Sequence, residues 1–352
     1  MNEIKLGVIG LGDIAQMHLE AFKKVKGVRI SALCTKSKDN LTLQSEKWGC
    51  TDGYTDYREM LAKADMDAVV VCVPPYLHKP ICIAALEAGK HVLCEKPPSM
   101  DDSEALEMQQ AANKNKRLLM YGFIFRFSQK HRVARELILG GDLGKLYFMH
   151  IELMHRCSAP GGWFQQKSFS GGGPVIDSGI HMLDLAMYLM GEVSPVRVYS
   201  KVFKGIENMN DVKDWTGNFF GRGVTEVRDV EEMAVAMISC DNGVEFLFTI
   251  SNNAHIKQDF HTVEILGTKG GLTIDPQLEI HTVVNNRHFD CKPVVNCDMF
   301  DYQGTFDGQA EHFISCIREG TPCISTAENG VKAMKMVSAI YRSAQSGEAV
   351  SI

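Results

Sequence analysis

Residues 4–15 read Ile-Lys-Leu-Gly-Val-Ile-Gly-Leu-Gly-Asp-Ile-Ala, and this stretch decides the fold of the first part of the chain. The apolar run at residues 4–9 predicts a buried strand, and the amphipathic pattern from residue 14 predicts a helix. The turn between them has the spacing G-x-G-x-x-A, which lets the backbone turn tightly and approach a pyrophosphate at the helix N-terminus. The sequence therefore predicts a dinucleotide-binding turn formed by Gly10, Gly12, Asp13 and Ile14.

The same pattern of apolar runs and amphipathic segments continues to residue 121. Further strands are predicted at 29–34, 68–73, 91–94 and 117–121. These runs are continuously apolar, which is typical of a parallel sheet covered on both faces. Strands that alternate with helices predict a doubly wound parallel α/β (Rossmann) domain, and we place it at residues 1–122.

The second part of the chain has a different pattern. From residue 196 to about residue 284 it reads mostly as strands, some of which are separated by hairpin turns such as Asp241-Asn242-Gly243. Two helices are predicted after these strands. Residues 123–352 are therefore predicted to form an α+β domain with a large, mostly antiparallel sheet. A long loop or lid is predicted at 204–227.

Composition and charge exclude several classes of protein. Hydrophobic residues make up 45% of the 352-residue chain and charged residues 23%, as in a folded globular protein. A net charge of −6 argues against nucleic acid as a partner, and no apolar run approaches the ~20 residues that span a bilayer. The chain begins without a secretory leader, so we expect a cytoplasmic location. Its 11 cysteines contain no C-x-x-C pair, and we expect reduced thiols and no metal.

The end of the second predicted strand bears on the choice of cofactor. A fold selective for NAD usually places an acidic side chain here to bind the ribose 2′-hydroxyl. This chain has Thr35, Lys36 and Ser37 instead. A lysine and two hydroxyls suit a 2′-phosphate, so we expect NAD(P) with a slight preference for NADP. The alternative is that Lys36 is a solvated surface charge.

The strand at 91–94 is followed by Glu95-Lys96-Pro97. In open α/β sheets ligands bind beyond the carboxyl ends of the strands, so these charges are predicted to lie near the nicotinamide. The proline restricts Lys96 to extended conformations and fixes its direction. An exposed ion pair in an ordinary turn is the alternative.

A second candidate motif is the glycine-rich stretch Gly-Gly-Gly-Pro-Val-Ile-Asp-Ser-Gly-Ile-His-Met-Leu-Asp at residues 171–184. Proline is tolerated in the first turn of a helix, so we predict a helix at 174–190. Asp177, His181 and Asp184 would then share one helical face, and two carboxylates would orient the histidine as a general acid or base. A hydrogen-bonded core histidine and a pair of metal ligands are the alternatives, although no third metal ligand shares the motif.

Together these motifs resemble the Gfo/Idh/MocA oxidoreductases, which act mainly on sugars, cyclitols and their derivatives. The resemblance covers nearly the whole chain and is carried by residues 10–15, Val73-Pro74-Pro75-Tyr76-Leu77-His78, residues 95–97 and residues 171–184. It implies that Lys96 binds the substrate hydroxyl near the nicotinamide and that His181 shuttles its proton. It also implies that Asp177 binds substrate or orients His181.

The resemblance implies further contacts and an assembly. Pro74 and His78 would line the nicotinamide pocket, Arg126 would lie near cofactor or substrate, and the Lys96–Pro97 peptide would be cis. The sheet of the second domain would form the interface of a homodimer or homotetramer. Val73 and Glu95 complete the predicted cofactor contacts. His155 and Trp163 could shape a sugar pocket, but each is equally typical of an ordinary loop or core.

We therefore expect a dehydrogenase that moves a hydride between nicotinamide and a secondary alcohol of a sugar, glycoside or cyclitol. His181 would take the hydroxyl proton, and Lys96 would stabilise the developing alkoxide. One alternative is an NAD-dependent glycoside-cleaving enzyme that oxidises C3 transiently, which would retain its cofactor and show no net reduction. The other is a non-catalytic cofactor-binding regulator, which would need no Lys96, Asp177 and His181 set.

Overall fold

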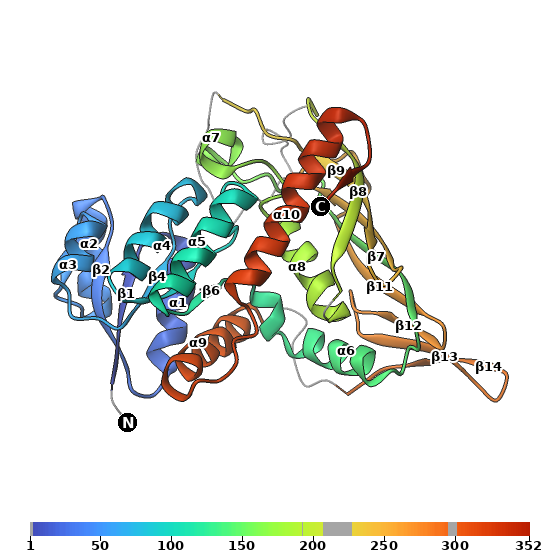
Figure 1. Ribbon diagram of the computed structural model, residues 1–352, viewed down its shortest axis with the longest axis horizontal. Coiled ribbons are helices and arrows are strands. Elements are labelled where there is room, and N and C mark those ends of the chain that lie inside the picture. Colours follow the sequence, from blue (N-terminus) through green and yellow to red (C-terminus); the bar gives the residue numbers. More distant parts are fainter. Residues whose placement is uncertain (1–2, 192, 207–226, 295–300) are drawn as a thin grey trace. The chain divides into compact units, whose positions relative to one another are not determined.

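The computed structural model describes residues 3–191, 193–206, 227–294 and 301–352 (Figure 1). The chain forms two compact units, one of residues 1–127 and 302–334 and the other of residues 128–301 and 335–352. The return of 302–334 to the first unit was not part of the domain division predicted from the sequence. The loop predicted at 204–227 lies, apart from its two ends, outside the described residues. No helix among the described residues is long and apolar enough to cross a membrane.

The first unit contains a six-stranded parallel sheet in the order β3-β2-β1-β4-β5-β6. Its strands are β1 (Ile4–Ile9), β2 (Val28–Cys34), β3 (Gly53–Tyr54), β4 (Ala68–Val71), β5 (His91–Cys94) and β6 (Leu119–Tyr121). Its helices are α1 (Asp13–Lys24), α2 (Lys38–Trp48), α3 (Tyr57–Lys63), η1 (Pro75–Leu77), α4 (His78–Glu87), α5 (Asp102–Asn115), η2 (Ile124–Phe127) and α9 (Tyr302–Glu319). This order is that of a doubly wound sheet, which confirms the predicted fold class.

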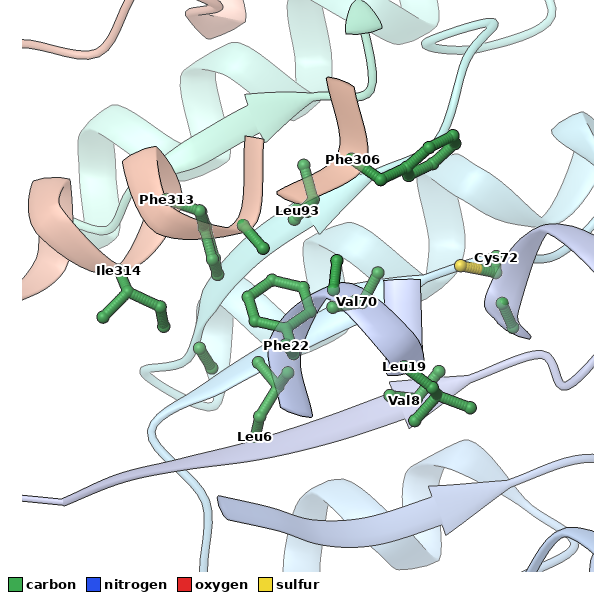
Figure 2. Packing of buried hydrophobic residues seen from close by; sticks show 14 of the residues in the cluster. Leu6, Val8, Leu19, Phe22, Val70, Cys72, Leu93, Phe306, Phe313 and Ile314 are labelled. Atoms are coloured by element: carbon green, nitrogen blue, oxygen red, sulfur yellow. The ribbon is translucent and has the colours of Figure 1, made fainter. Parts of the chain in front are cut away.

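The core of the first unit includes a helix that is distant in sequence. Phe22 of α1 packs edge-on against Phe313 of α9, with their ring centroids 6.2 Å apart (Figure 2). Phe306 of α9 also belongs to this cluster and is 1% exposed. Each such ring contributes roughly 1.5–3 kcal/mol when it is fully buried. The sequence prediction had placed α9 in the second domain, but its apolar face complements that of α1.

The second unit contains nine described strands in the order β14-β13-β12-β11-β7-β10-β9-β8-β15. They are β7 (Leu146–Met154), β8 (Pro195–Phe203), β9 (Met233–Cys240), β10 (Glu245–Ser251), β11 (Phe260–Gly267), β12 (Gly270–Thr273), β13 (Glu279–Val284), β14 (Arg287–Cys291) and β15 (Val350–Ser351). Its helices are α6 (Gln129–Gly140), η3 (Gly162–Gln165), α7 (Lys167–Ser170), α8 (Gly179–Met190) and most of α10 (Ala327–Ser346), which begins in the first unit. Among the described strands of this sheet only β7 and β10 pair in parallel, so the predicted mostly antiparallel sheet is confirmed.

Helix α8 begins five residues later than the sequence predicted. Residues 174–178 form a turn, and the Gly179 N–H donates to Pro174 O at 2.7 Å. The Glu231 carboxylate accepts the N–H groups of Gly173 and Val175, at 3.0 and 3.1 Å, and so satisfies the backbone ahead of the helix. The prediction that Asp177, His181 and Asp184 share one face of a helix was therefore wrong for Asp177, which precedes α8.

Candidate active-site residues in the two units

The turn after β1 fits the pyrophosphate of a dinucleotide. Gly10 has φ +89°, and a Cβ at this position would lie 2.2 Å from the carbonyl oxygen of Cys72. Gly12 is the N-cap of α1, and a Cβ there would meet nothing within 4 Å. Asp13 and Ile14 form the first turn of α1, where no side chain caps the helix. The turn therefore leaves backbone N–H groups at a helix N-terminus facing open space, which suits an anion.

The residues after β2 lie beside this turn, because the Gly10 N–H donates to Cys34 O at 2.9 Å. Thr35 is half-buried, whereas Lys36 and Ser37 are exposed. The Ser37 hydroxyl oxygen accepts the Asn40 N–H at 3.2 Å and so caps α2. Lys36 is therefore the one cation of the three, and its exposure is compatible with a 2′-phosphate or with solvent.

A buried pair links α1 to the end of β5. His18 Nε2 lies 2.6 Å from Glu95 Oε1, and the two side chains are 1% and 6% exposed. The other carboxylate oxygen of Glu95 accepts the Lys96 N–H at 3.0 Å. Glu95 therefore faces the interior rather than a ligand and holds the backbone of Lys96. The sequence analysis missed His18, although a histidine within the buried apolar stripe of α1 was a signal.

His78 joins the two loops that carry the predicted nicotinamide contacts. Its Nδ1 lies 2.8 Å from Pro97 O, and its Nε2 lies 2.8 Å from Val73 O. The side chain is fully buried, and this burial lowers the pKa of His78. The Lys96–Pro97 peptide is cis, and Val73 and Pro74 remain half-buried. His78 therefore has no exposed surface for a direct cofactor contact, and its ring connects the two loops through these backbone carbonyls.

Arg126 also faces the interior of the first unit. It lies in η2 and is 4% exposed. Its Nη1 donates to Ile324 O at 2.5 Å, and its guanidinium carbon lies 6.0 Å from the ring centroid of Phe123. This arginine thus connects η2 to the segment that follows α9.

In the second unit, the turn that precedes α8 borders a pocket, and His181 and Asp184 of α8 are not part of its lining. His181 lies in the first turn of α8 and is 9% exposed, and Asp184 is 2% exposed. Asp177 is half-buried and lines the pocket. The pocket is bounded by Ala159, Pro160, Phe164, Gln165, Gly172, Gly173, Pro174, Asp177, Arg228, Val230, Glu231, Glu232 and Asn252. Several of these residues carry side chains that hydrogen-bond hydroxyl groups.

Glu232 supplies another carboxylate to this pocket, besides Asp177 and Glu231. Its Oε1 lies 3.1 Å from Arg228 Nη2, and its side chain is 6% exposed. Among the described residues nothing donates to its Oε2. Burial raises the pKa of Glu232, although the Arg228 charge opposes this rise. The sequence analysis missed Glu232, because no motif surrounds it.

Glu231 fixes the glycine-rich loop. Besides two backbone N–H groups, its Oε1 accepts the Tyr341 hydroxyl at 2.8 Å. A Cβ at Gly173 would lie 2.1 Å from Glu231 O, so only glycine allows this approach. Burial raises the pKa of Tyr341 well above its ordinary value, and the neighbouring Glu231 charge adds to the rise. The hydroxyl therefore stays protonated and donates.

The two predicted sugar-pocket residues lie outside the lining of this pocket. His155 Nδ1 lies 3.0 Å from Asp259 Oδ2. Trp163 stacks on Phe164, with ring centroids 3.7 Å apart, and Phe164 contributes to the lining instead.

Two family profiles match this chain. "Oxidoreductase family, NAD-binding Rossmann fold" matches residues 4–123, and "Oxidoreductase family, C-terminal alpha/beta domain" matches residues 135–352. D-Glucoside 3-dehydrogenase of Escherichia coli K12 is 30% identical over 354 residues, which cover 100% of this chain and 98% of that protein. Myo-inositol 2-dehydrogenase of Thermotoga maritima is 26% identical over 350 residues, with 99% and 98% covered.

Solved structures have the same fold. Levoglucosan dehydrogenase in complex with NADH superimposes with a TM-score of 0.86 at 22% identity, covering 100% of this chain and 99% of that one. The chain therefore belongs to the Gfo/Idh/MocA oxidoreductase family, with an NAD-binding Rossmann domain followed by the C-terminal alpha/beta domain of that family.

Proposed function

We propose that this oxidoreductase oxidises, or forms by reduction, a secondary alcohol of a sugar, glycoside or cyclitol. The observation that carries the proposal is the pocket of the second unit, whose lining includes Asp177, Glu232, Arg228 and Asn252, side chains that can hydrogen-bond hydroxyl groups. The relatives named for dehydrogenation of glucosides, inositol and levoglucosan support this substrate class.

Three side chains act on the substrate in this proposal. Lys96 of the first unit binds the reacting hydroxyl and stabilises the negative charge that develops on its oxygen. His181 of the second unit accepts the hydroxyl proton, or returns it in the reverse direction. Asp177 binds a neighbouring hydroxyl. When bound, the nicotinamide supplies the redox chemistry of the step.

Two buried groups hold Lys96 in this proposal. The Glu95 carboxylate fixes its backbone N–H, and His78 fixes the carbonyl of the following proline. These contacts restrict the start of the side chain without contacting the substrate. His78 and Glu95 are therefore positioning residues, whereas Gly10, Gly12 and the first turn of α1 hold the pyrophosphate.

We further propose that Lys36 lets the site accept the 2′-phosphate of NADP. Lys36 follows the strand next to the pyrophosphate turn and is exposed. Lys38, which is also exposed and begins α2, provides a matched control. If Lys36 binds the phosphate, K36A lowers the affinity for NADP and leaves the affinity for NAD unchanged. K38A should leave both affinities unchanged.

We also propose a homo-oligomer formed through the sheet of the second unit. Tyr199 and Phe203 of β8 are 45% and 46% exposed, and Met237, the register partner of Tyr199 on β9, is 41% exposed. Several large apolar side chains exposed on one face of a sheet are typical of an interface. Light scattering should give the mass of a dimer or tetramer, and Y199E should lower it. A monomeric wild type would refute this part of the proposal.

The activity is tested by nicotinamide absorbance against a panel of sugars, glycosides and cyclitols, with NAD and NADP separately. Net reduction with a panel member supports a dehydrogenase. Tight cofactor retention with product release but no net reduction would instead show internal redox cycling.

Substitutions then test the residue roles. K96M should lower kcat by about 100-fold or more, the usual effect of removing one group that stabilises developing charge. Cofactor affinity should change little, and K79M serves as a control, because Lys79 of α4 pairs with Glu104 and Glu107. Because Lys96 and His181 act on one oxygen, K96M/H181N should be little worse than the poorer single variant. Near-normal turnover of K96M would overturn the assignment.

A further inference from the structure

The first unit contains a cluster of metal-ligating side chains that the proposed reaction does not use. His312 and Cys316 lie on α9, and Cys323 lies in the loop after it. One ligand atom from each residue lies within 4.8 Å of the other two. It is the one group of three such residues among those that the structure describes. All three side chains are half-buried, so an ion can reach them from solvent.

We propose that His312, Cys316 and Cys323 form a site for a soft divalent cation of the Zn²⁺ type, with water as the fourth ligand. The distance from His312 Nε2 to Cys316 Sγ is 3.4 Å. Tetrahedral zinc bound to sulfur at about 2.3 Å and nitrogen at about 2.0 Å separates two such ligands by roughly 3.5 Å. The nitrogen and the sulfur therefore already have the separation that a shared ion requires.

The local sequence explains this geometry. His312 and Cys316 are four residues apart on α9 and so lie on one side of the helix. The chain then leaves the helix at Gly320, which has φ +70°, and the following loop carries Cys323 back to them. Motifs based on C-x-x-C do not detect this arrangement, because its two thiols are separated by seven positions.

One backbone contact beside the cluster favours the ligand form of His312. The Ile324 N–H donates to His312 Nε2 at 3.0 Å, so this nitrogen carries a lone pair rather than a proton. Thiolate sulfur and unprotonated imidazole are the forms that bind zinc.

Binding has a defined proton balance and a local consequence. The ion takes both sulfurs as thiolates, and any proton still present on either thiol is released to solvent. The ion also replaces the Ile324 N–H as the partner of His312. Because Ile324 O accepts a hydrogen bond from Arg126, the backbone of the same residue connects the cluster to η2.

The test uses the full chain with C291S and C297S as background, so that these two thiols do not contribute. After chelation and reduction, the protein is titrated with Co²⁺ and followed by its sulfur-to-metal charge-transfer and visible bands, and then with Zn²⁺ in competition. We expect one ion per chain and a tetrahedral spectrum. H312Q, C316S and C323S should each weaken binding more than about 100-fold, since even supporting residues cost 10–100-fold.

Controls distinguish an ion held by these three side chains from an ion bound elsewhere and from a redox-active pair of thiols. C82S, a fully buried thiol on α4, should leave the stoichiometry and the spectrum unchanged. Circular dichroism of the metal-free variants should match the background protein, because the ion is absent from both. No Co²⁺ spectrum from the folded background protein would overturn the proposal. An affinity for Co²⁺ that H312Q leaves unchanged would also overturn it. A Cys316–Cys323 disulfide that forms equally fast with and without Zn²⁺ would overturn it as well and would indicate a redox pair.

Discussion

Replacement by alanine should affect a different property at each of the two glycines in the turn after β1: stability at Gly10 and NAD affinity at Gly12. At Gly10 the backbone has φ +89°, and a Cβ would lie 2.2 Å from the carbonyl oxygen of Cys72 and 2.6 Å from its carbonyl carbon. The left-handed conformation costs an alanine about 1–2 kcal/mol, and relief of the overlap costs about 1–3 kcal/mol more. G10A should therefore destabilise the protein by roughly 2–5 kcal/mol.

Gly12 provides the matched control. Its φ of −79° is open to any residue, and a Cβ there would meet no atom within 4 Å. G12A should cost less than about 1 kcal/mol, the scale of an N-cap change. The added methyl group does, however, enter the space that we propose for the pyrophosphate. G12A should therefore weaken NAD binding by about tenfold, or ~1.4 kcal/mol.

Two measurements on each variant test this reasoning. Thermal denaturation without cofactor should show G10A falling by roughly 4–20 °C, at 2–4 °C per kcal/mol, with G12A close to the wild type. Calorimetric titration with NAD should show the affinity loss in G12A. A wild-type Tm for G10A would refute the structural argument. An equal loss of Tm in both variants would show that the turn tolerates no side chain anywhere, and unchanged NAD affinity in G12A would remove the pyrophosphate from this turn.

Three further outcomes are expected. E231A removes the acceptor of three hydrogen bonds, and each group left unpaired costs about 1–3 kcal/mol. Chemical denaturation should therefore show that the free energy of unfolding falls by ~3 kcal/mol or more. A fall of less than ~1 kcal/mol would contradict the anchoring role of Glu231. Burial lowers the pKa of His78 from its ordinary value of 6.5. As the pH falls below about 6.5, the unfolded chain therefore gains a proton on His78 before the folded chain does. The free energy of unfolding should fall there by up to ~1.4 kcal/mol per pH unit. H78Q should make that drop in unfolding free energy shallower, and an unchanged slope would count against the assignment. K36A should raise the Kd for NADP by about tenfold with NAD unchanged, as expected for loss of one charged phosphate contact, whereas equal effects on both cofactors would exclude selectivity.

The fold was predictable wherever the signal is local. The strand runs, the glycine turn and the change to an antiparallel pattern all depend on residues close together in the chain. The position of α9 was not predictable in this way, because Phe306 and Phe313 look like any apolar helix face until α1 is known to lie against them. The β13–β14 hairpin was also missed, although Asn285 and Asn286, with φ of 49° and 60°, are typical of its turn.

The site was predictable for the residues that belong to motifs. Lys96 and His181 were identified from their surroundings in sequence, and their roles remain proposals. The late start of α8 was not predictable, because it depends on a carboxylate 56 and 58 residues further along the chain. Glu232 likewise has no motif, and only the pocket that it lines distinguishes it from other acidic residues.

The supporting residues of both units share one physical property that explains why motifs miss them. His18 lies 77 residues from Glu95, and Glu231 lies 110 residues from Tyr341. Each is a buried polar group, and burial is tolerable only when partners are supplied. The partners come from remote segments of the chain. The identity of such a residue is therefore determined by a contact in the folded protein and not by its neighbours in the sequence. In the first unit this contact joins α1, which begins at the cofactor turn, to the backbone of Lys96, so a change at His18 should alter turnover through Lys96 without touching either ligand.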